Sequence, residues 1–285
     1  MRMRIGARTF EGPGPFLMGV VNATPDSFSD GGRFQDPGAA EARALEMAEE
    51  GADLVDVGGE STRPGAAPVP ADEEIRRVVP VLTRLRARGF PLPVSVDTSK
   101  PEVARAALDA GADLVNDVAG LAAPGMAELV AERGVPAVIM HARGTPADMA
   151  ARALYADLLE EVAAELWEAL VRAERAGVRR ERILLDPGIG FAKTAAQSAE
   201  LLARLPRLRA LGCPLVVGPS RKSFIGKITG APVAERLPGT LAAVAACVLA
   251  GAEVLRVHDV GPARQAAQVA AAIRDAGATP PHRGG

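Results

Sequence analysis

Eight short apolar segments recur along the chain, and segments with helical spacing separate them. The eight are LMGVVN (17–22), DLVDVG (53–58), LPVSVD (92–97), DLVND (113–117), PAVIMH (136–141), ILLDPG (183–188), PLVVG (214–218) and EVLRVHDV (253–260). They are rich in β-branched residues and apolar throughout, which is typical of strands that are buried on both faces of a parallel sheet. The intervening segments have apolar residues three and four positions apart, and most of them end at glycine, as helices often do.

This alternation predicts a (β/α)8 barrel, the TIM barrel, in which each parallel strand is followed by a helix. An open, doubly wound sheet is the competing architecture, but the count of eight and the lack of GxGxxG after the first strand favour the barrel. We expect residues 1–16 to form a short strand or hairpin that closes the barrel bottom, and residues 276–285 to form a disordered tail. The chain, residues 1–285, is then a single domain.

Composition excludes several classes of protein. A formal net charge of −2 and a hydrophobic content of 48% argue against a disordered chain and against a nucleic-acid partner. Cys213 and Cys247 lie in apolar surroundings, and no CxxC or HExxH motif indicates a zinc site. The N-terminus lacks a long apolar region, and the most apolar stretch is interrupted by Gly251 and short for a membrane span. We therefore expect a cytoplasmic protein that binds small molecules, with no membrane partner.

Polar residues stand at the carboxyl end of every predicted strand, where barrels of this kind bind ligands. Two chemical groups occur among them: Asp97, Asn116 and Asp186, and Lys222, Arg256 and His258. The first group can recognise the edge of a flat heterocycle, because a carboxylate accepts two parallel N–H bonds. The second group suits an anionic leaving group. One polar residue often only caps the next helix, but polar residues at all eight ends predict an active site.

Two further residues at these ends have different expectations. Asn22, together with acidic residues of the loop that follows it, offers oxygen ligands to Mg²⁺, which also binds phosphates readily. His141 follows the fifth strand, and a structural role explains it at least as well as ligand contact. The sequence thus predicts a single ligand site at the carboxyl ends of the strands, with oxygen ligands for Mg²⁺ at Asn22 and the loop that follows it.

Seven motifs of the chain resemble, in order, those of the dihydropteroate synthase family. They are MGVVNATPDSFSDGG, DVGGESTRPG, VDTSKPEVARAALDAGADLVNDVAG, IMHARGTP, LLDPGIGFAKT, VGPSRKSFIG and RVHDV, within residues 17–260. The resemblance implies a pterin-binding TIM barrel that condenses 6-hydroxymethyl-7,8-dihydropterin diphosphate with 4-aminobenzoate. The products are 7,8-dihydropteroate and pyrophosphate, in the step of folate biosynthesis that sulfonamides inhibit. The resemblance also implies a homodimer and Mg²⁺, and two loops that become ordered when ligands bind.

The resemblance assigns the site residues to three subsites. Asp97, Asn116, Met140, Asp186 and Lys222 would hold the pterin; Asn22, Thr62, Arg256 and His258 the diphosphate, with the metal at Asn22; and Thr62, Arg63, Pro64, Phe191 and Ser223 the 4-aminobenzoate.

The chemistry of this reaction assigns catalytic roles to four residues. The carbon that loses pyrophosphate is attached to an electron-rich ring, so we expect an SN1-like path through a delocalised cation. An aryl amine is a nucleophile at neutral pH, so no strong base is needed. Lys222 would donate hydrogen bonds to the pterin, Asp97 and Asp30 would shield the cation, and Phe28 would exclude water.

Three other functions compete with this one. A corrinoid-linked methyltransferase of the methyltetrahydrofolate type has a similar pterin pocket, but SRKS and RVHDV favour a site for diphosphate. A binding protein that has lost catalysis would lack some of the predicted site residues, and here all are present. A Schiff base at Lys222 would indicate a class I aldolase and would leave the other cations of the mouth unexplained.

Overall fold

The computed structural model describes residues 1–24, 37–62 and 65–278. Within these ranges, eight parallel strands form one sheet in the order β8-β7-β6-β5-β4-β3-β10-β9. They are β3 (Phe16–Asn22), β4 (Leu54–Gly58), β5 (Val94–Asp97), β6 (Leu114–Asp117), β7 (Ala137–Met140), β8 (Ile183–Asp186), β9 (Val216–Val217) and β10 (Val254–Val257). A parallel bridge between Leu185 and Leu215 joins β8 to the segment that enters β9, so the sheet curls round on itself. The predicted barrel is confirmed, and every predicted strand is present.

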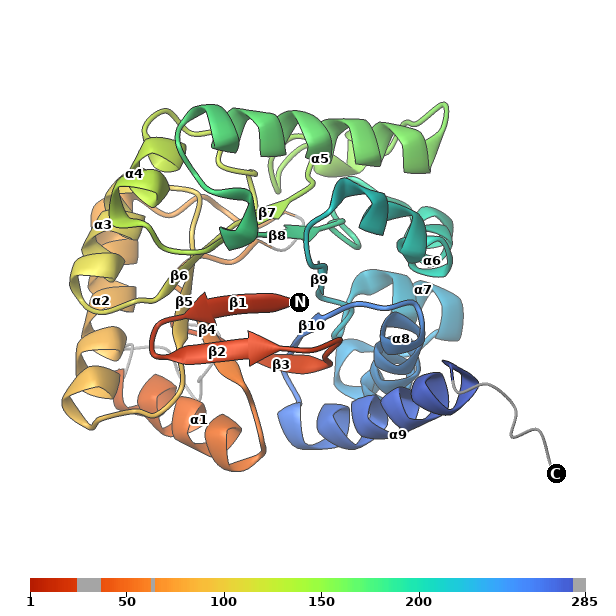
Figure 1. Cartoon of the computed structure of the whole chain (residues 1–285), viewed down its shortest axis with the longest axis horizontal. Coiled ribbons are helices and arrows are strands. Elements are labelled where there is room, and N and C mark those ends of the chain that lie inside the picture. Colours follow the sequence, from red (N-terminus) through yellow and green to blue (C-terminus); the bar gives the residue numbers. More distant parts are fainter. Residues whose placement is uncertain (25–36, 63–64, 279–285) are drawn as a thin grey trace, which may run out of the picture.

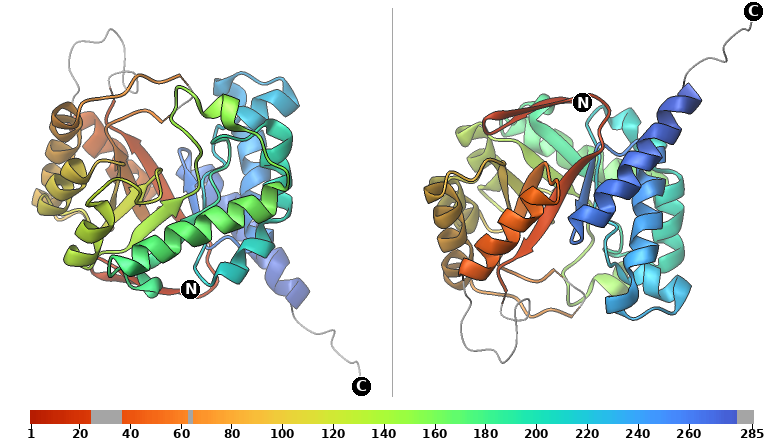
Figure 2. Two further views of the ribbon diagram at one scale, coloured as in Figure 1. Left: turned by 90° about the horizontal axis from the view of Figure 1, so that it is seen from above. Right: turned by 90° about the horizontal axis from the view of Figure 1, so that it is seen from below.

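Helices surround the strands on the outside of the barrel (Figures 1 and 2). They are α1 (Pro37–Glu49), α2 (Ala71–Ala87), α3 (Pro101–Asp109), α4 (Met126–Arg133), α5 (Leu158–Arg175), α6 (Ala195–Ala203), α7 (Ser223–Thr229), α8 (Leu237–Leu249) and α9 (Val260–Ala278). Both α7 and α8 follow β9, so the SRKS motif leads into a short extra helix. Among the described residues, no helix is long and apolar enough to cross a membrane.

The N-terminal residues form the expected hairpin, with β1 (Arg2–Ile5) antiparallel to β2 (Arg8–Glu11). Its buried residues Met3, Ile5 and Phe10 pack against residues at the amino ends of the barrel strands, such as Leu54 and Leu114. Apolar side chains therefore close the bottom of the barrel below the carboxyl ends of the strands. The right-hand view of Figure 2 shows this hairpin beside the amino end of β3.

At the other terminus, α9 continues to Ala278, so residues 276–278 of the expected tail are helical. Residues 279–285 lie outside the described residues, and the disorder expected for them stays a prediction.

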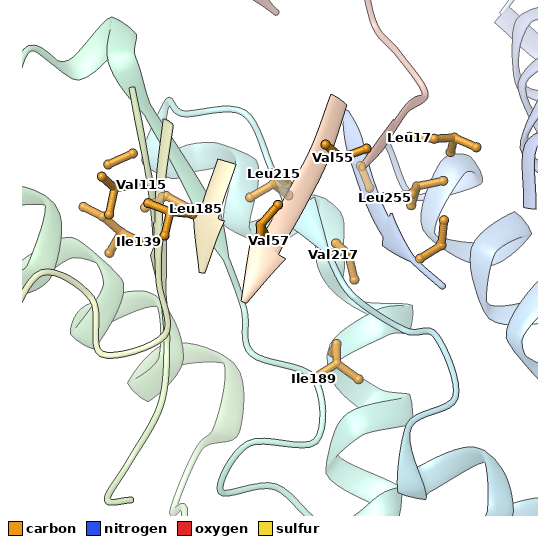
Figure 3. Packing of buried hydrophobic residues seen from close by; sticks show 14 of the residues in the cluster. Leu17, Val55, Val57, Val115, Ile139, Leu185, Ile189, Leu215, Val217 and Leu255 are labelled. Carbon is orange, nitrogen blue, oxygen red and sulfur yellow. The ribbon is translucent and has the colours of Figure 1, made fainter. Parts of the chain in front are cut away.

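Alternation along each strand separates the packing residues from the site residues, because successive side chains of a strand point to opposite faces. In β4, Val55 and Val57 belong to the large buried cluster between strands and helices, part of which Figure 3 shows. Leu54 instead packs in the barrel bottom against the hairpin. Asp56 shares the inward side with Leu54, and it is fully buried.

Candidate active site

The centre of the site is an arginine between two carboxylates. Arg256 extends from β10, and its Nε donates to Asp56 Oδ2 at 2.6 Å while its Nη2 donates to Asp97 Oδ2 at 2.6 Å. Asn116 Nδ2 also donates to Asp56 Oδ2, at 2.9 Å. In register, Asp97 lies beside Asn116 on the neighbouring strand. The four side chains therefore form one network across β4, β5, β6 and β10.

Burial changes the acidity of this network. The pKa of Asp97 is raised to about 7, chiefly because burial disfavours the carboxylate. The Arg256 guanidinium opposes this rise, and the nearby carboxylate of Asp56 adds to it. Near neutral pH, Asp97 can therefore gain or lose a proton in response to a charged ligand.

The second part of the site is the pair of Lys222 and Asp186. Lys222 immediately precedes α7, and its Nζ lies 4.0 Å from the centroid of the Phe191 ring, a cation–π contact. Burial lowers the pKa of Lys222 to about 8, and the negative charge of Asp186 opposes this. Burial likewise raises the pKa of Asp186, against a 2.7 Å hydrogen bond from the Gly188 N–H and the charge of Lys222.

Two adjoining cavities lie at the carboxyl ends of the strands and share Thr62, Phe191, Lys222 and Arg256 as lining residues. The smaller one has a volume of about 20 Å³, and Asn116, Met140 and Asp186 also line it. The larger one has a volume of about 270 Å³, and its further lining includes Asn22, Asp97, Ser223 and His258. Every predicted site residue within the described ranges therefore lines at least one cavity. Phe28, Asp30, Arg63 and Pro64 lie outside the described residues.

Hydrogen bonds fix two of the side chains at the larger cavity. The His258 N–H donates to Ser220 Oγ at 3.2 Å, and His258 Nδ1 lies 3.0 Å from the same oxygen. Arg221 makes two hydrogen bonds to Asp259, at 3.0 and 2.5 Å, and its φ of 57° places it in the left-handed region. A non-glycine residue there is strained, and such strain is common at functional sites.

The chain matches a known protein family over most of its length. A family model described as "Pterin binding enzyme" matches residues 18–258. The dihydropteroate synthase of Synechocystis sp. is 45% identical over 272 residues, which cover 94% of this chain and 94% of that protein. The chain belongs to the dihydropteroate synthase family. A probable bifunctional folylpolyglutamate synthase/dihydropteroate synthase of Haloferax volcanii is 47% identical over 92% of this chain, but the match spans only 31% of that longer protein.

Solved structures of the dihydropteroate synthase family have the same fold. The Xanthomonas albilineans enzyme with 4-aminobenzoic acid has a TM-score of 0.90 and 48% identity, covering 98% of this chain and 99% of that one. The same enzyme with 7,8-dihydropteroate gives a TM-score of 0.88 and 45% identity, covering 98% of this chain and 100% of that one. These names favour the synthase over the corrinoid-linked alternative.

Two residues of the site, Asp56 and Arg236, were not identified from the sequence. Asp56 lies within an apolar strand, and although the motif DVGGESTRPG begins with it, no site role was predicted for it. Arg236 lines the larger cavity, and its Nη1 donates to the Arg221 carbonyl at 3.2 Å, yet none of the seven motifs contains it. His141 lines neither cavity and is buried in a polar cluster, as its structural interpretation predicted.

Proposed function

We infer that the chain catalyses the dihydropteroate synthase reaction, joining 6-hydroxymethyl-7,8-dihydropterin diphosphate to 4-aminobenzoate. The observation that carries this inference is the pair of adjoining cavities, which meet at Lys222 and Phe191. Asn116 and Asp186 line only the smaller cavity, whereas Arg221, Arg236 and His258 line only the larger one. Two substrates of these chemistries would meet at the shared wall, where the new C–N bond forms.

Recognition of the pterin would use the smaller cavity. Asp186 can accept two parallel N–H bonds from an aminopyrimidine edge, as a carboxylate does from a guanidinium. Asn116 offers both a donor and an acceptor, and Lys222 donates to a ring oxygen or nitrogen. The smaller cavity has a volume of about 20 Å³, so a pterin would also occupy part of the adjoining larger cavity.

The charged groups of the site would stabilise the leaving group and the cation that forms in the reaction. The C–O bond to the diphosphate breaks and its electron pair leaves with pyrophosphate, near Arg256 and His258. The pterin-bound carbon becomes a delocalised cation, which the Asp97 carboxylate stabilises electrostatically. The lone pair of the aryl amine forms the C–N bond, and the amine proton passes to solvent or to pyrophosphate. We propose the same shielding role for Asp30, and exclusion of water for Phe28.

Magnesium would bind on the diphosphate side. Among the described residues, no three His, Cys, Asp or Glu side chains gather to hold a metal. Asn22 nevertheless lines the larger cavity with His258 and Arg256. A single amide oxygen fits Mg²⁺, because this ion usually keeps several waters and binds substrate phosphates. When bound, Mg²⁺ would neutralise charge on the leaving group.

We also propose a homodimer. In the described chain, exposed apolar residues occur on three helices at one side of the barrel: Ile228 on α7, Leu249 on α8, and Val269 and Ile273 on α9. α8 has no charged residue and packs against both α7 and α9. A second copy would bury this apolar surface. Sedimentation analysis tests this: Leu249→Glu should be monomeric where the unmodified protein is a dimer, and a monomeric unmodified protein would contradict the proposal.

The cytoplasmic location of the protein stays a prediction.

The release of pyrophosphate tests the proposed activity. Purified protein with Mg²⁺ and the dihydropterin diphosphate should release pyrophosphate when 4-aminobenzoate is present. Lys222→Ala should reduce this release by a factor of about 100 or more, because a group that stabilises developing charge contributes about 3 kcal/mol. Lys227→Ala is the matched control, since Lys227 is exposed on α7. Tight pterin binding with no release would instead indicate a binding protein.

A further inference from the structure

The loop after β8, residues 187–194, has three residues in a backbone conformation that is rare for residues other than glycine. Gly188, Gly190 and Ala192 have φ angles of 68°, 80° and 47°, all in the left-handed region. Ala192 is not a glycine, so this conformation is strained. The same loop carries Phe191, whose ring borders both cavities. The position of the ring therefore depends on what holds the loop.

A buried lysine forms hydrogen bonds to two backbone carbonyl groups of this loop. Lys193 is 8% exposed, and its Nζ donates to the carbonyl oxygens of Phe191 at 3.0 Å and Gly188 at 3.1 Å. The same Nζ lies 2.8 Å from His141 Nδ1. An ammonium group has three N–H donors and no acceptor. Within the described residues, all three donors are therefore used by acceptors from two segments of the chain.

His141 connects this lysine to helix α5. Because Nδ1 accepts from Lys193, the imidazole proton is on Nε2, which donates to Glu165 Oε2 at 3.0 Å. Burial, followed by the charge of Lys193, lowers the pKa of His141 to about 3, so the ring is neutral at physiological pH. Glu165 also accepts from Arg143 Nε at 2.9 Å. A continuous polar chain thus runs from α5 to the loop that carries Phe191.

We propose that Lys193 is a positioning residue for the aminobenzoate side of the site: its ammonium group fixes the Gly188 and Phe191 carbonyls and thereby the position of the Phe191 ring. The proposal rests on the proposed function, since the effect is read in the use of 4-aminobenzoate. Neither of the two cavities has Lys193 in its lining, so it acts through Phe191 and not on the substrate directly.

The charged and titratable groups that face Lys193 come from four elements: Asp186 at the end of β8, His141 and Arg143 after β7, Glu165 on α5, and Lys222 before α7. Burial lowers the pKa of Lys193 to about 7, the two carboxylates oppose this, and Lys222 and Arg143 lower it further. As the pH rises through about 7, the neutral amine keeps only two N–H donors, and one acceptor loses its bond. The KM for 4-aminobenzoate should therefore increase with pH.

Steady-state kinetics of Lys193→Met test the proposal. We expect the KM for 4-aminobenzoate to rise roughly tenfold at about pH 6.5, while kcat and the KM for the pterin diphosphate stay within about threefold. The KM of the unmodified protein for 4-aminobenzoate should rise towards that of Lys193→Met as the pH approaches about 8.5. The KM of Lys193→Met should show no such rise. Lys227→Met controls for loss of a lysine charge. A KM for 4-aminobenzoate within twofold of the unmodified protein, or an unchanged pH profile, would overturn the proposal.

Two further measurements keep the test decisive if Lys193→Met fails to fold. Glu165→Gln removes a charge that favours the ammonium, so the midpoint of the KM profile should move to lower pH; an unmoved midpoint contradicts the proposal. The chain has three histidines, which makes ¹⁵N-histidine NMR simple to assign. His141 should show the Nε2–H tautomer, and its Nδ1 signal should shift as Lys193 loses its proton near pH 7. This signal does not depend on turnover, so an inactive protein with the expected shift would refute only the proposed function.

Discussion

Replacement of Arg256 by methionine is the sharpest test of the charge network. The guanidinium lies between Asp56, which is fully buried, and Asp97, which is 7% exposed. Methionine keeps much of the apolar stem but leaves both carboxylates without their shared cation. Removing one partner of a buried ion pair costs about 3–5 kcal/mol, because a buried charge is left uncompensated. We therefore expect the free energy of unfolding to fall by about this amount at about pH 8.

The size of the loss should depend on pH in a defined direction. The pKa of Asp97 is raised to about 7 in the folded protein, from an ordinary value of 3.8. Between these values the folded state binds more protons than the unfolded state, so stability decreases as the pH rises. Arg256 limits this effect, since it lowers the pKa of Asp97. Without Arg256 the pKa of Asp97 rises further. At a pH above this pKa, each additional pKa unit lowers the free energy of unfolding by about 1.36 kcal/mol.

Urea denaturation at about pH 5 and about pH 8 measures this difference. At the lower pH, Asp97 is protonated with or without Arg256, so the loss caused by Arg256→Met should be smaller by about 1.4 kcal/mol or more. Arg8→Met, at an exposed position of β2, controls for the loss of one arginine. Equal losses at both pH values would refute the coupling between Asp97 and Arg256.

Two other substitutions have defined outcomes in the same denaturation assay. Lys222→Met should raise the free energy of unfolding by roughly 1–3 kcal/mol at about pH 6, since burial lowers the pKa of Lys222 to about 8. The gain should shrink as the pH rises above about 8 and disappear above about pH 10.5, where the lysine is neutral in both the folded and the unfolded state; a pH-independent change would contradict this account. In Gly188→Ala, the new Cβ would lie 1.9 Å from the His141 carbonyl oxygen at a φ of 68°, so we expect a loss of about 3 kcal/mol or more. Gly230→Ala has a φ of 76° and no described atom within 4 Å, so it should cost only about 1 kcal/mol, and equal losses would exclude the clash.

The barrel and much of its mouth could be predicted because topology alone brings them together. In a closed parallel barrel, all strands end at the same rim. Asp97 and Asp186 lie far apart in the sequence, yet each ends a strand, and both line the mouth. Lys222 was found in the same way, since it follows the seventh strand. For these residues, the order of strands and helices contains the needed information.

Residues that act through long-range contacts could not be found this way. The partner of Lys193 is His141, 52 residues earlier in the chain, and nothing in either segment indicates the contact. The pairing of Asp56 with Arg256 follows only from the registers of β4 and β10 against β3, which lies between them, and the two residues are 200 positions apart. Such contacts depend on how side chains pack, which spacing along one strand does not specify.

The choice of lysine at these positions has a physical reason. The chain contains 29 arginines and 4 lysines, so a lysine is an exception that the local structure must explain. Lys193 and Lys222 are both held in confined places where burial lowers the pKa. A compact ammonium can donate along three directions to convergent acceptors, whereas a planar guanidinium is wider and stays charged at any accessible pH.

Lys100 also links two segments of the chain, although its pKa is raised, because burial, which lowers it, is outweighed by the hydrogen bonds to Glu60 and Glu74. It contacts both Glu60 and the fully buried Glu74, and Glu60 Oε1 accepts from the Val69 N–H at 3.0 Å. Through Glu60, Lys100 thus holds both ends of the segment that carries Thr62, just as Lys193 holds the loop that carries Phe191.

Lys193→Arg should behave like Lys193→Met in the KM for 4-aminobenzoate, because a guanidinium keeps the charge but is wider than an ammonium. A normal KM in Lys193→Arg would show that charge alone, and not the shape of the ammonium group, positions the loop.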